Sequence, residues 1–250
     1  MANKLYNQEY LEQLHGILLN TKQKSCELLN PKSTDTIVDV GCGSGMDAIN
    51  LAQSGAKVYG FDNDEKFIKT AKKQQAVGLK VNFICADASN LPLENESVDK
   101  IRFDRVFQHL DNYDTILAEA YRLLKPGGQI QIIDPDYFSI TFFLSNIELE
   151  RKLLDNISYK RIPNSYKVRQ IPEYLKNNKF EIGLTEIHYY NINDYNLAVN
   201  IIKFEEVINE ELNKGNITEN ELADWNELKN LSANNFNFSF NMIIFQAKKL

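Results

Sequence analysis

Apolar residues in this chain occur in short runs that alternate with segments of helical periodicity. Three runs, over residues 37–40, 57–62 and 81–85, have the length and composition of buried strands, and amphipathic helical segments follow the first two. Two more runs, over residues 97–103 and 129–133, flank another helical segment, and the first of them has one polar face. Strands that alternate with helices at this rhythm form βαβ units, so we predict a parallel sheet with right-handed crossovers.

The pattern changes on both sides of this central region. Residues 5–29 have apolar positions at helical spacing, and Pro31 predicts that this helical stretch ends near Leu29. The stretch precedes the first strand and is expected to cover one end of the sheet. Residues 136–168 are rich in aromatic side chains and helical only in part. Two long strands are predicted over residues 180–190 and 236–247, and the helical segment between them is an insertion of the kind that often forms a lid.

The first predicted strand stops at three glycines, Gly41, Gly43 and Gly45, and a helix begins directly after them. Glycines at such a turn let the backbone approach a ligand closely. The start of the following helix then directs free N–H groups and partial positive charge at that ligand. We therefore predict a cradle for a nucleotide-type cofactor.

The spacing of the glycines decides between cofactors. They form the pattern G-x-G-x-G, and Met46 stands where the dinucleotide fingerprint G-x-G-x-x-G has its last glycine. Asp62 ends the second strand about 20 residues after the glycines, where a carboxylate can accept both hydroxyls of a ribose. The third strand ends in the sequence Ala-Asp-Ala over residues 86–88.

These motifs together resemble those of class I S-adenosylmethionine-dependent methyltransferases. They are VDVGCGSG at residues 38–45, the acidic Asp62, ADASNLP at residues 86–92 and LKPGG at residues 124–128. The resemblance implies an α/β fold: a Rossmann-like, seven-stranded, mostly parallel sheet that ends in an antiparallel hairpin and has helices on both faces.

The resemblance also implies one methyltransferase domain over residues 1–250. Its predicted parts are an N-terminal helical cap (1–33), a cofactor-binding core (34–135), a lid insertion (136–168) and the rest of the sheet (169–250), with a helical insertion at about 194–235.

The implied cofactor is S-adenosyl-L-methionine, with the glycine loop under its methionine part. Asp62 is then expected on the ribose diol, and Asp87 with Ala88 at the adenine. Asp39 fits a role in ordering the loop better than one in touching ligand, and Asp64 fits a helix cap. The predicted cofactor-binding set is Asp39, Gly41, Cys42, Gly43, Gly45, Asp62, Asn63, Asp87, Ala88, Asp104 and Arg105.

Candidates for catalysis follow the fourth and fifth strands, at the carboxyl ends where α/β sheets bind ligands. His109 is either a general base or a histidine that packs against a helix. Arg105 is either a surface charge or a clamp for a carboxylate. Asp136 either faces the methyl acceptor as a second candidate base or belongs to a turn with Pro135.

Composition narrows the class of protein. The chain has 250 residues, enough for one α/β domain, and a net charge of −6 disfavours nucleic acid or an anionic membrane as a partner. Its three scattered cysteines suit a reducing cytoplasm, and no apolar run is long enough to cross a membrane. No His, Cys or Asp cluster has the spacing of metal ligands, so we predict no metal.

We therefore predict an enzyme that moves a methyl group to an oxygen, nitrogen or carbon nucleophile of a small molecule by in-line displacement. A nicotinamide-dependent oxidoreductase on a similar sheet and a non-catalytic module that binds S-adenosylmethionine are the alternatives. The aromatic residues after the fifth strand either roof an apolar acceptor pocket or pack the lid onto the sheet. They are Tyr137, Phe138, Phe142, Phe143 and Tyr159.

Overall fold

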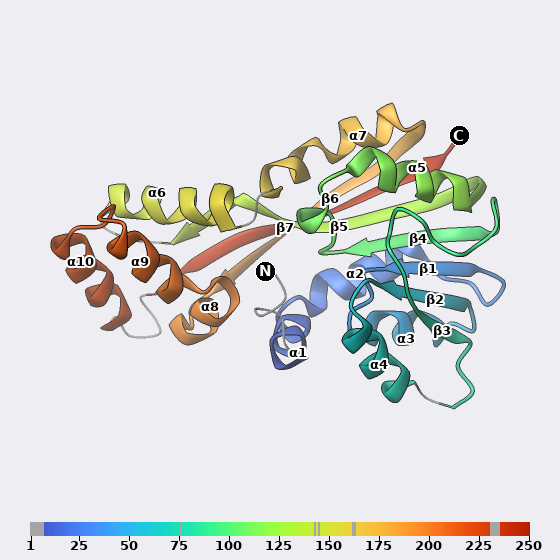
Figure 1. Ribbon diagram of the computed structural model, residues 1–250, viewed down its shortest axis with the longest axis horizontal. Helices are drawn as coiled ribbons and strands as arrows, with labels where there is room; N and C mark the ends of the chain where they lie inside the picture. Colours follow the sequence, from blue (N-terminus) through green and yellow to red (C-terminus); the bar gives the residue numbers. More distant parts are fainter. Residues whose placement is uncertain (1–7, 76, 143, 145, 162–163, 231–235) are drawn as a thin grey trace. The chain divides into compact units, whose positions relative to one another are not determined.

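The computed structural model describes residues 8–75, 77–142, 144, 146–161, 164–230 and 236–250 (Figure 1). The chain consists of two compact units. The first unit, which we call the core unit, comprises Leu19–Asp134, Lys167–Glu186 and Ile243–Leu250. The second, the helical unit, comprises Met1–Leu18, Pro135–Tyr166 and Ile187–Met242.

The strands of the described chain form one seven-stranded sheet in the order β3-β2-β1-β4-β5-β7-β6. The pairs β1–β2, β2–β3, β1–β4 and β4–β5 are parallel, and the last two strands run antiparallel. This confirms the predicted fold class. The strands are β1 (Thr36–Val40), β2 (Lys57–Asp62), β3 (Val81–Cys85), β4 (Val98–Asp104), β5 (Leu124–Phe142), β6 (Phe180–Ile192) and β7 (Phe238–Lys249).

Helices of the core unit cover both faces of its strands. Alternate strand residues such as Val38, Ile101 and Phe103 enter one apolar core with α5 (Tyr113–Leu123) and α7 (Ile171–Asn177). The strand residues of the opposite face, Ile37 and Val58 among them, pack against another set of helices. These are α2 (Leu19–Leu29), α3 (Met46–Ala52) and α4 (Glu65–Gln74).

Side-chain caps fix where two of these helices begin. The Asp64 carboxylate accepts a hydrogen bond from the Lys66 N–H at 2.7 Å and caps α4, which confirms the expected role of Asp64. The Asn112 side chain accepts from the Thr115 N–H at 3.2 Å and caps α5. Each cap satisfies a backbone donor that the first turn of a helix leaves without a partner.

Two predicted elements differ from the structure. The N-terminal helical stretch consists of two helices, α1 (Gln8–Ile17) and α2, with a break at Leu18. The fifth strand is longer than the predicted residues 129–133, because β5 continues beyond its last pairing with β4 and lies beside β7. Ser139 accepts from the Asn241 N–H at 2.8 Å in this extension. Asp136 therefore lies within a strand and not in a turn.

The helical unit has an aromatic core of its own. Trp225 is fully buried, and the rings of Phe142 and Phe204 meet its indole edge-on or tilted at centroid distances of 6.1 and 5.7 Å. A capping box predicts the start of the last helix, and Thr218 and Glu221 exchange both expected hydrogen bonds. The unit's helices are α1, α6 (Ile147–Asp155), α8 (Tyr195–Ile202), α9 (Phe204–Asn213), α10 (Glu219–Asn230) and the π-helical η3 (Asn156–Arg161).

Candidate functional site

The glycine loop between β1 and α3 has the backbone shape that its residues predict. Gly41, Gly43 and Gly45 have φ angles of 70°, 52° and 85°, in the left-handed region where side chains are strained. A Cβ atom on Gly41 would lie 2.4 Å from a methyl group of Val106, in the loop that follows β4. The glycine loop and the loop after β4 therefore touch at Gly41, and no larger residue fits there.

Asp62, at the end of β2, is tied directly to this loop. One carboxylate oxygen accepts a hydrogen bond from the Gly43 N–H and the other from the Asp64 N–H, each at 2.9 Å. Burial raises the pKa of the Asp62 carboxyl, although these backbone donors oppose the rise. Each oxygen has a second lone pair, so the carboxylate is held in place and can still accept further hydrogen bonds.

The residues predicted near the adenine lie at the carboxyl end of β3. Asp87 is exposed and accepts hydrogen bonds from the backbone N–H and the hydroxyl of Ser89, which lower its pKa. Ala88 is half-buried and packs at the margin of the apolar core. The Asn63 side chain is exposed, and its carbonyl lies 3.6 Å from the Cys85 sulfur. Cys42 is half-buried in the glycine loop, and burial raises the pKa of its thiol.

The loop after β4 brings the other candidates together. Arg105 has a left-handed backbone, with a φ of 58°, and its Nε donates to Asp104 at 3.1 Å. Asp134, at the end of the β4-paired part of β5, accepts from the backbone N–H groups of Phe107 and Gln108. His109 ends the 3-10 helix η2 (Phe107–His109), and dehydration together with the charge of Arg105 lowers its pKa. A lowered pKa keeps this imidazole neutral at pH 7.

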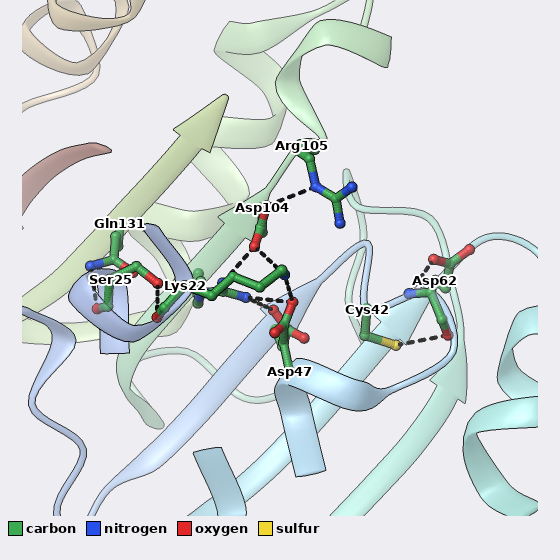
Figure 2. A network of polar contacts seen from close by, with 11 residues as sticks. Lys22, Ser25, Cys42, Asp47, Asp62, Asp104, Arg105 and Gln131 are labelled. Carbon is green, nitrogen blue, oxygen red and sulfur yellow. Dashed lines mark hydrogen bonds and ion pairs between the residues drawn. The ribbon is translucent and has the colours of Figure 1, made fainter. Parts of the chain in front are cut away.

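A buried group of charged side chains lies beneath these two loops, and the sequence analysis missed three of its members, Lys22, Asp47 and Arg102. We call it the ionic cluster: Lys22 of α2, Asp39 of β1, Asp47 of α3, and Arg102 and Asp104 of β4. Lys22 donates to both Asp47 and Asp104, the latter at 2.9 Å (Figure 2). Arg102 donates to Asp104 at 2.6 Å and to Asp39 at 3.3 Å.

Most of the ionic cluster is shielded from water. The side chains of Arg102 and Asp39 are each 3% exposed, and those of Lys22 and Asp104 are each 7% exposed, whereas that of Asp47 is half-buried at 19%. Burial raises the pKa of Asp39 to about 7, although Arg102 opposes the rise. For Asp104 the balance is reversed: burial opposes ionisation, but the Lys22 and Arg102 charges hold its pKa well below its usual range.

Two residues of the predicted cofactor-binding set, Asp39 and Asp104, form ion pairs within the ionic cluster. Asp39 lies under the glycine loop, paired with Arg102, which is a position that orders the loop. The Asp104 carboxylate is shared by Lys22, Arg102 and Arg105. In the sequence, the cluster was indicated by the alternation of the charged residues Lys100, Arg102 and Asp104 along β4. This alternation did not indicate which residues elsewhere in the chain would pair with them.

Asp136 and the predicted aromatic roof belong to the helical unit. Asp136 is buried and accepts a hydrogen bond from the Phe138 N–H at 3.2 Å. Phe142 packs in the aromatic core of the unit, and Phe143 lies outside the described residues. The other three aromatic residues help to line a cavity of about 200 Å³ whose walls are Tyr137, Phe138, Ile140, Arg151, Leu154, Asp155, Ser158 and Tyr159.

Among the described residues, no helix is both long and apolar enough to span a membrane. The same residues contain no group of three or more His, Cys, Asp or Glu side chains that could hold a metal ion. The predicted absence of a metal stays a prediction.

Comparison with known proteins identifies the type of domain. Residues 38–132 match the family described as "Methyltransferase domain". A protein of Streptomyces fradiae, named an uncharacterized 37.1 kDa protein in transposon TN4556, is 32% identical over 167 residues, which cover 65% of this chain and 48% of that protein. The demethylmenaquinone methyltransferase of Oceanobacillus iheyensis is 28% identical over 151 residues, which cover 58% of this chain and 63% of that enzyme.

Solved structures show the same fold. Phosphoethanolamine N-methyltransferase 2 of Haemonchus contortus, solved with phosphomonomethylethanolamine and S-adenosylhomocysteine, superposes with a TM-score of 0.57 at 21% identity. The superposition covers 99% of this chain and 58% of that one. The matched segment spans 48%, 63% and 56% of the length of three curated relatives, the Streptomyces fradiae protein and the demethylmenaquinone methyltransferases of Oceanobacillus iheyensis and Thermus thermophilus.

Proposed function

Because the chain belongs to the class I S-adenosylmethionine-dependent methyltransferases, we propose that it transfers the methyl group of this cofactor to a nucleophile of a small molecule. The observation that carries the proposal is the link between the glycine loop and Asp62. A carboxylate that is held by the N–H of Gly43 stands at the end of β2, beside a backbone turn that only glycine can make.

The residues present fit this cofactor. Both oxygens of Asp62 are oriented by backbone donors and retain lone pairs that suit the two hydroxyls of a ribose. Asp87 and Ala88 follow β3, the next strand of the sheet, where the adenine would lie. Arg105, beside the glycine loop, would face the methionine carboxylate. The rest of the predicted cofactor set stays part of this proposal.

When bound, S-adenosylmethionine supplies a methyl group that its sulfonium makes electrophilic. The chain's own work is then to hold an acceptor atom in line with the S–CH₃ bond, and such positioning is worth about 7–11 kcal/mol. An acceptor that must lose a proton needs a base. The neutral imidazole of His109 and the carboxylate of Asp136 are the candidates that we propose for that role.

The acceptor that we propose is small and partly apolar. The relatives named above act, by their names, on demethylmenaquinone and phosphoethanolamine, which are small molecules. The cavity of the helical unit has two aromatic rings, those of Phe138 and Tyr159, in edge-to-face contact at 5.1 Å, and a cation, Arg151, in its wall. A net charge of −6 disfavours a nucleic acid as the acceptor.

Replacing Asp62 by alanine tests the cofactor assignment. Each hydrogen bond lost between a hydroxyl and this carboxylate costs about 1.5–3 kcal/mol, so the dissociation constant for S-adenosylhomocysteine should rise at least about tenfold. Isothermal titration calorimetry on the folded variant measures this change.

Asp64→Ala is the matched control. It removes a neighbouring carboxylate that caps α4, so it should cost about 1 kcal/mol of stability and leave the affinity unchanged. Equal affinity of wild type and Asp62→Ala for S-adenosylhomocysteine would refute the ribose assignment.

The same titrations separate the alternatives. Binding of NADH without binding of S-adenosylhomocysteine would favour an oxidoreductase. Tight binding of S-adenosylhomocysteine without turnover on a broad panel of acceptors would favour a non-catalytic module. To find the acceptor, the protein is incubated with radiolabelled S-adenosylmethionine and fractionated cell extract; label found only in macromolecules would contradict a small acceptor.

A further inference from the structure

The two loops that surround the proposed cofactor position meet at one tight contact. Gly41 of the glycine loop lies against Val106 of the loop after β4, and a methyl group on Gly41 would overlap it at 2.4 Å. This contact is apolar and involves few atoms. It therefore leaves the distance between the two loops to be fixed by the polar contacts next to them.

The Lys22 side chain contacts one residue next to each loop, Asp47 after the glycine loop and Asp104 before the loop that follows β4. Asp47 is the second residue of α3, directly after the glycine loop, and Asp104 is the last residue of β4, directly before the other loop. The Lys22 ammonium donates to one oxygen of each carboxylate, and Figure 2 shows its side chain extending between them. Arg102 makes the same connection from β4, with Nη2 at 2.6 Å from Asp104 and Nη1 at 3.6 Å from Asp47.

Charge explains why this arrangement needs Lys22 in particular. Asp39, Asp47 and Asp104 all lie beside Arg102, so one guanidinium is shared by three acidic groups. Lys22 pairs with both Asp47 and Asp104 and so joins Arg102 as a cation between the two loops. Without Lys22, Asp47 would keep Arg102 at 3.6 Å and Asp104 would keep Arg102 and Arg105, so the attraction that holds these two carboxylates together would weaken.

We propose that Lys22 is a positioning residue of the cofactor site. Its ammonium holds the end of the glycine loop against the start of the loop after β4, and so fixes the opening between them in which the methionine part of the cofactor would lie. This inference rests on the proposed function. It assigns to α2, a helix outside the family's motifs, a direct part in cofactor affinity.

Lys22→Met tests the proposal, because it keeps the length of the side chain and removes the charge. We expect the affinity for S-adenosylhomocysteine, measured by calorimetry, to fall at least about tenfold, by analogy with the loss when residues that orient the ligands of a metal site are removed. Lys22→Arg, which restores a cation, should recover most of the affinity. Recovery in Lys22→Arg would show that the affinity depends on the charge at this position and not on the packing of the lysine side chain.

Lys100→Met is the matched control. Lys100 lies on the same face of β4, is 14% exposed and pairs with Asp35 at 2.6 Å, but at the end of the strand away from the loops. The Lys100→Met variant should be less stable than wild type, but its affinity for S-adenosylhomocysteine should stay within about twofold of the wild-type value. Equal affinities of wild type and Lys22→Met, or equal losses in Lys22→Met and Lys100→Met, would overturn the proposal.

A second variant covers the case in which Lys22→Met does not fold. Asp47→Asn keeps an acceptor for Lys22 and removes one charge, so it should fold and bind S-adenosylhomocysteine more weakly; unchanged binding by it would also contradict the proposal. The wild-type titration separates the two inferences. If wild type binds and Lys22→Met binds equally well, only the role of Lys22 fails, whereas a wild type that does not bind removes both.

Discussion

The two faces of β4 show opposite ways of burying one strand. On one face Ile101 and Phe103 enter an apolar core beneath α5 and are 0% and 1% exposed. On the other face Arg102 is just as deeply buried, at 3% exposure, but it is surrounded by carboxylates and covered by α2. The strand therefore separates a core held by apolar packing from a core held by charge.

This difference shows where the fold places buried charges, which are costly to remove from water. Burying charge gains little stability over a well-packed apolar core, and losing one partner of a buried pair is severe. The charged face is also the one whose residues adjoin the glycine loop and the loop after β4. Directional contacts fix the position of backbone more closely than apolar contacts do, which suits the side of the strand next to the proposed cofactor site.

Removing the centre of the ionic cluster should have the largest effect. Arg102→Met removes the guanidinium that donates to Asp39, and we expect a loss of about 3–5 kcal/mol in the free energy of unfolding, measured with urea. Adding Asp39→Leu removes the stranded carboxylate and should recover at least half of that loss. A double variant as unstable as Arg102→Met alone would mean that charge is not what holds this face.

The second largest effect is a pH dependence of stability, which is expected from the charged face of the sheet, where Asp39 titrates, and not from the apolar face. The pKa of Asp39 is about 7 in the folded chain and near 4 when unfolded, so the folded state holds the extra proton between these values. The stability that this proton gives is fully present below about pH 4, falls as the pH rises from about 4 to about 7, and is lost above about pH 7.

We therefore expect wild type to lose more stability between pH 5 and pH 8 than Asp39→Asn, by at least about 1 kcal/mol, since each pKa unit corresponds to about 1.4 kcal/mol. Urea unfolding at the two pH values measures the difference. Asp62 and Asp134 also have raised pKa values, so the variant should keep part of the slope. Parallel pH profiles for the two proteins would contradict the assignment to Asp39.

The smallest effect is expected on the apolar face. Ile101→Val removes one methylene group from a fully buried side chain and should cost about 0.5–1.5 kcal/mol. Because no charge is involved, the cost should be the same at pH 5 and pH 8 and at low and high salt. A cost that varied with pH would show that the two faces are coupled through the strand.

The sequence alone was sufficient for most of the elements of the core unit and for the glycine loop with its neighbouring carboxylate. Period-2 runs and glycine breaks predicted the strands, and the pattern around Gly41, Gly43 and Asp62 predicted a turn and a carboxylate that the structure brings into one hydrogen-bonded unit. Such features are local: a positive φ needs glycine, and the end of one parallel strand lies beside the end of the next.

Pairing between distant charges could be decided only by the tertiary structure. The alternation along β4 predicted a polar face, which sequence patterns normally assign to solvent, and nothing in α2 indicated that Thr21, Lys22 and Ser25 would be its buried side. Lys22 lies 25 residues from Asp47 and 82 residues from Asp104 along the chain. Which charges meet depends on how a helix packs across the sheet, and that packing is a property of the whole fold and not of any segment.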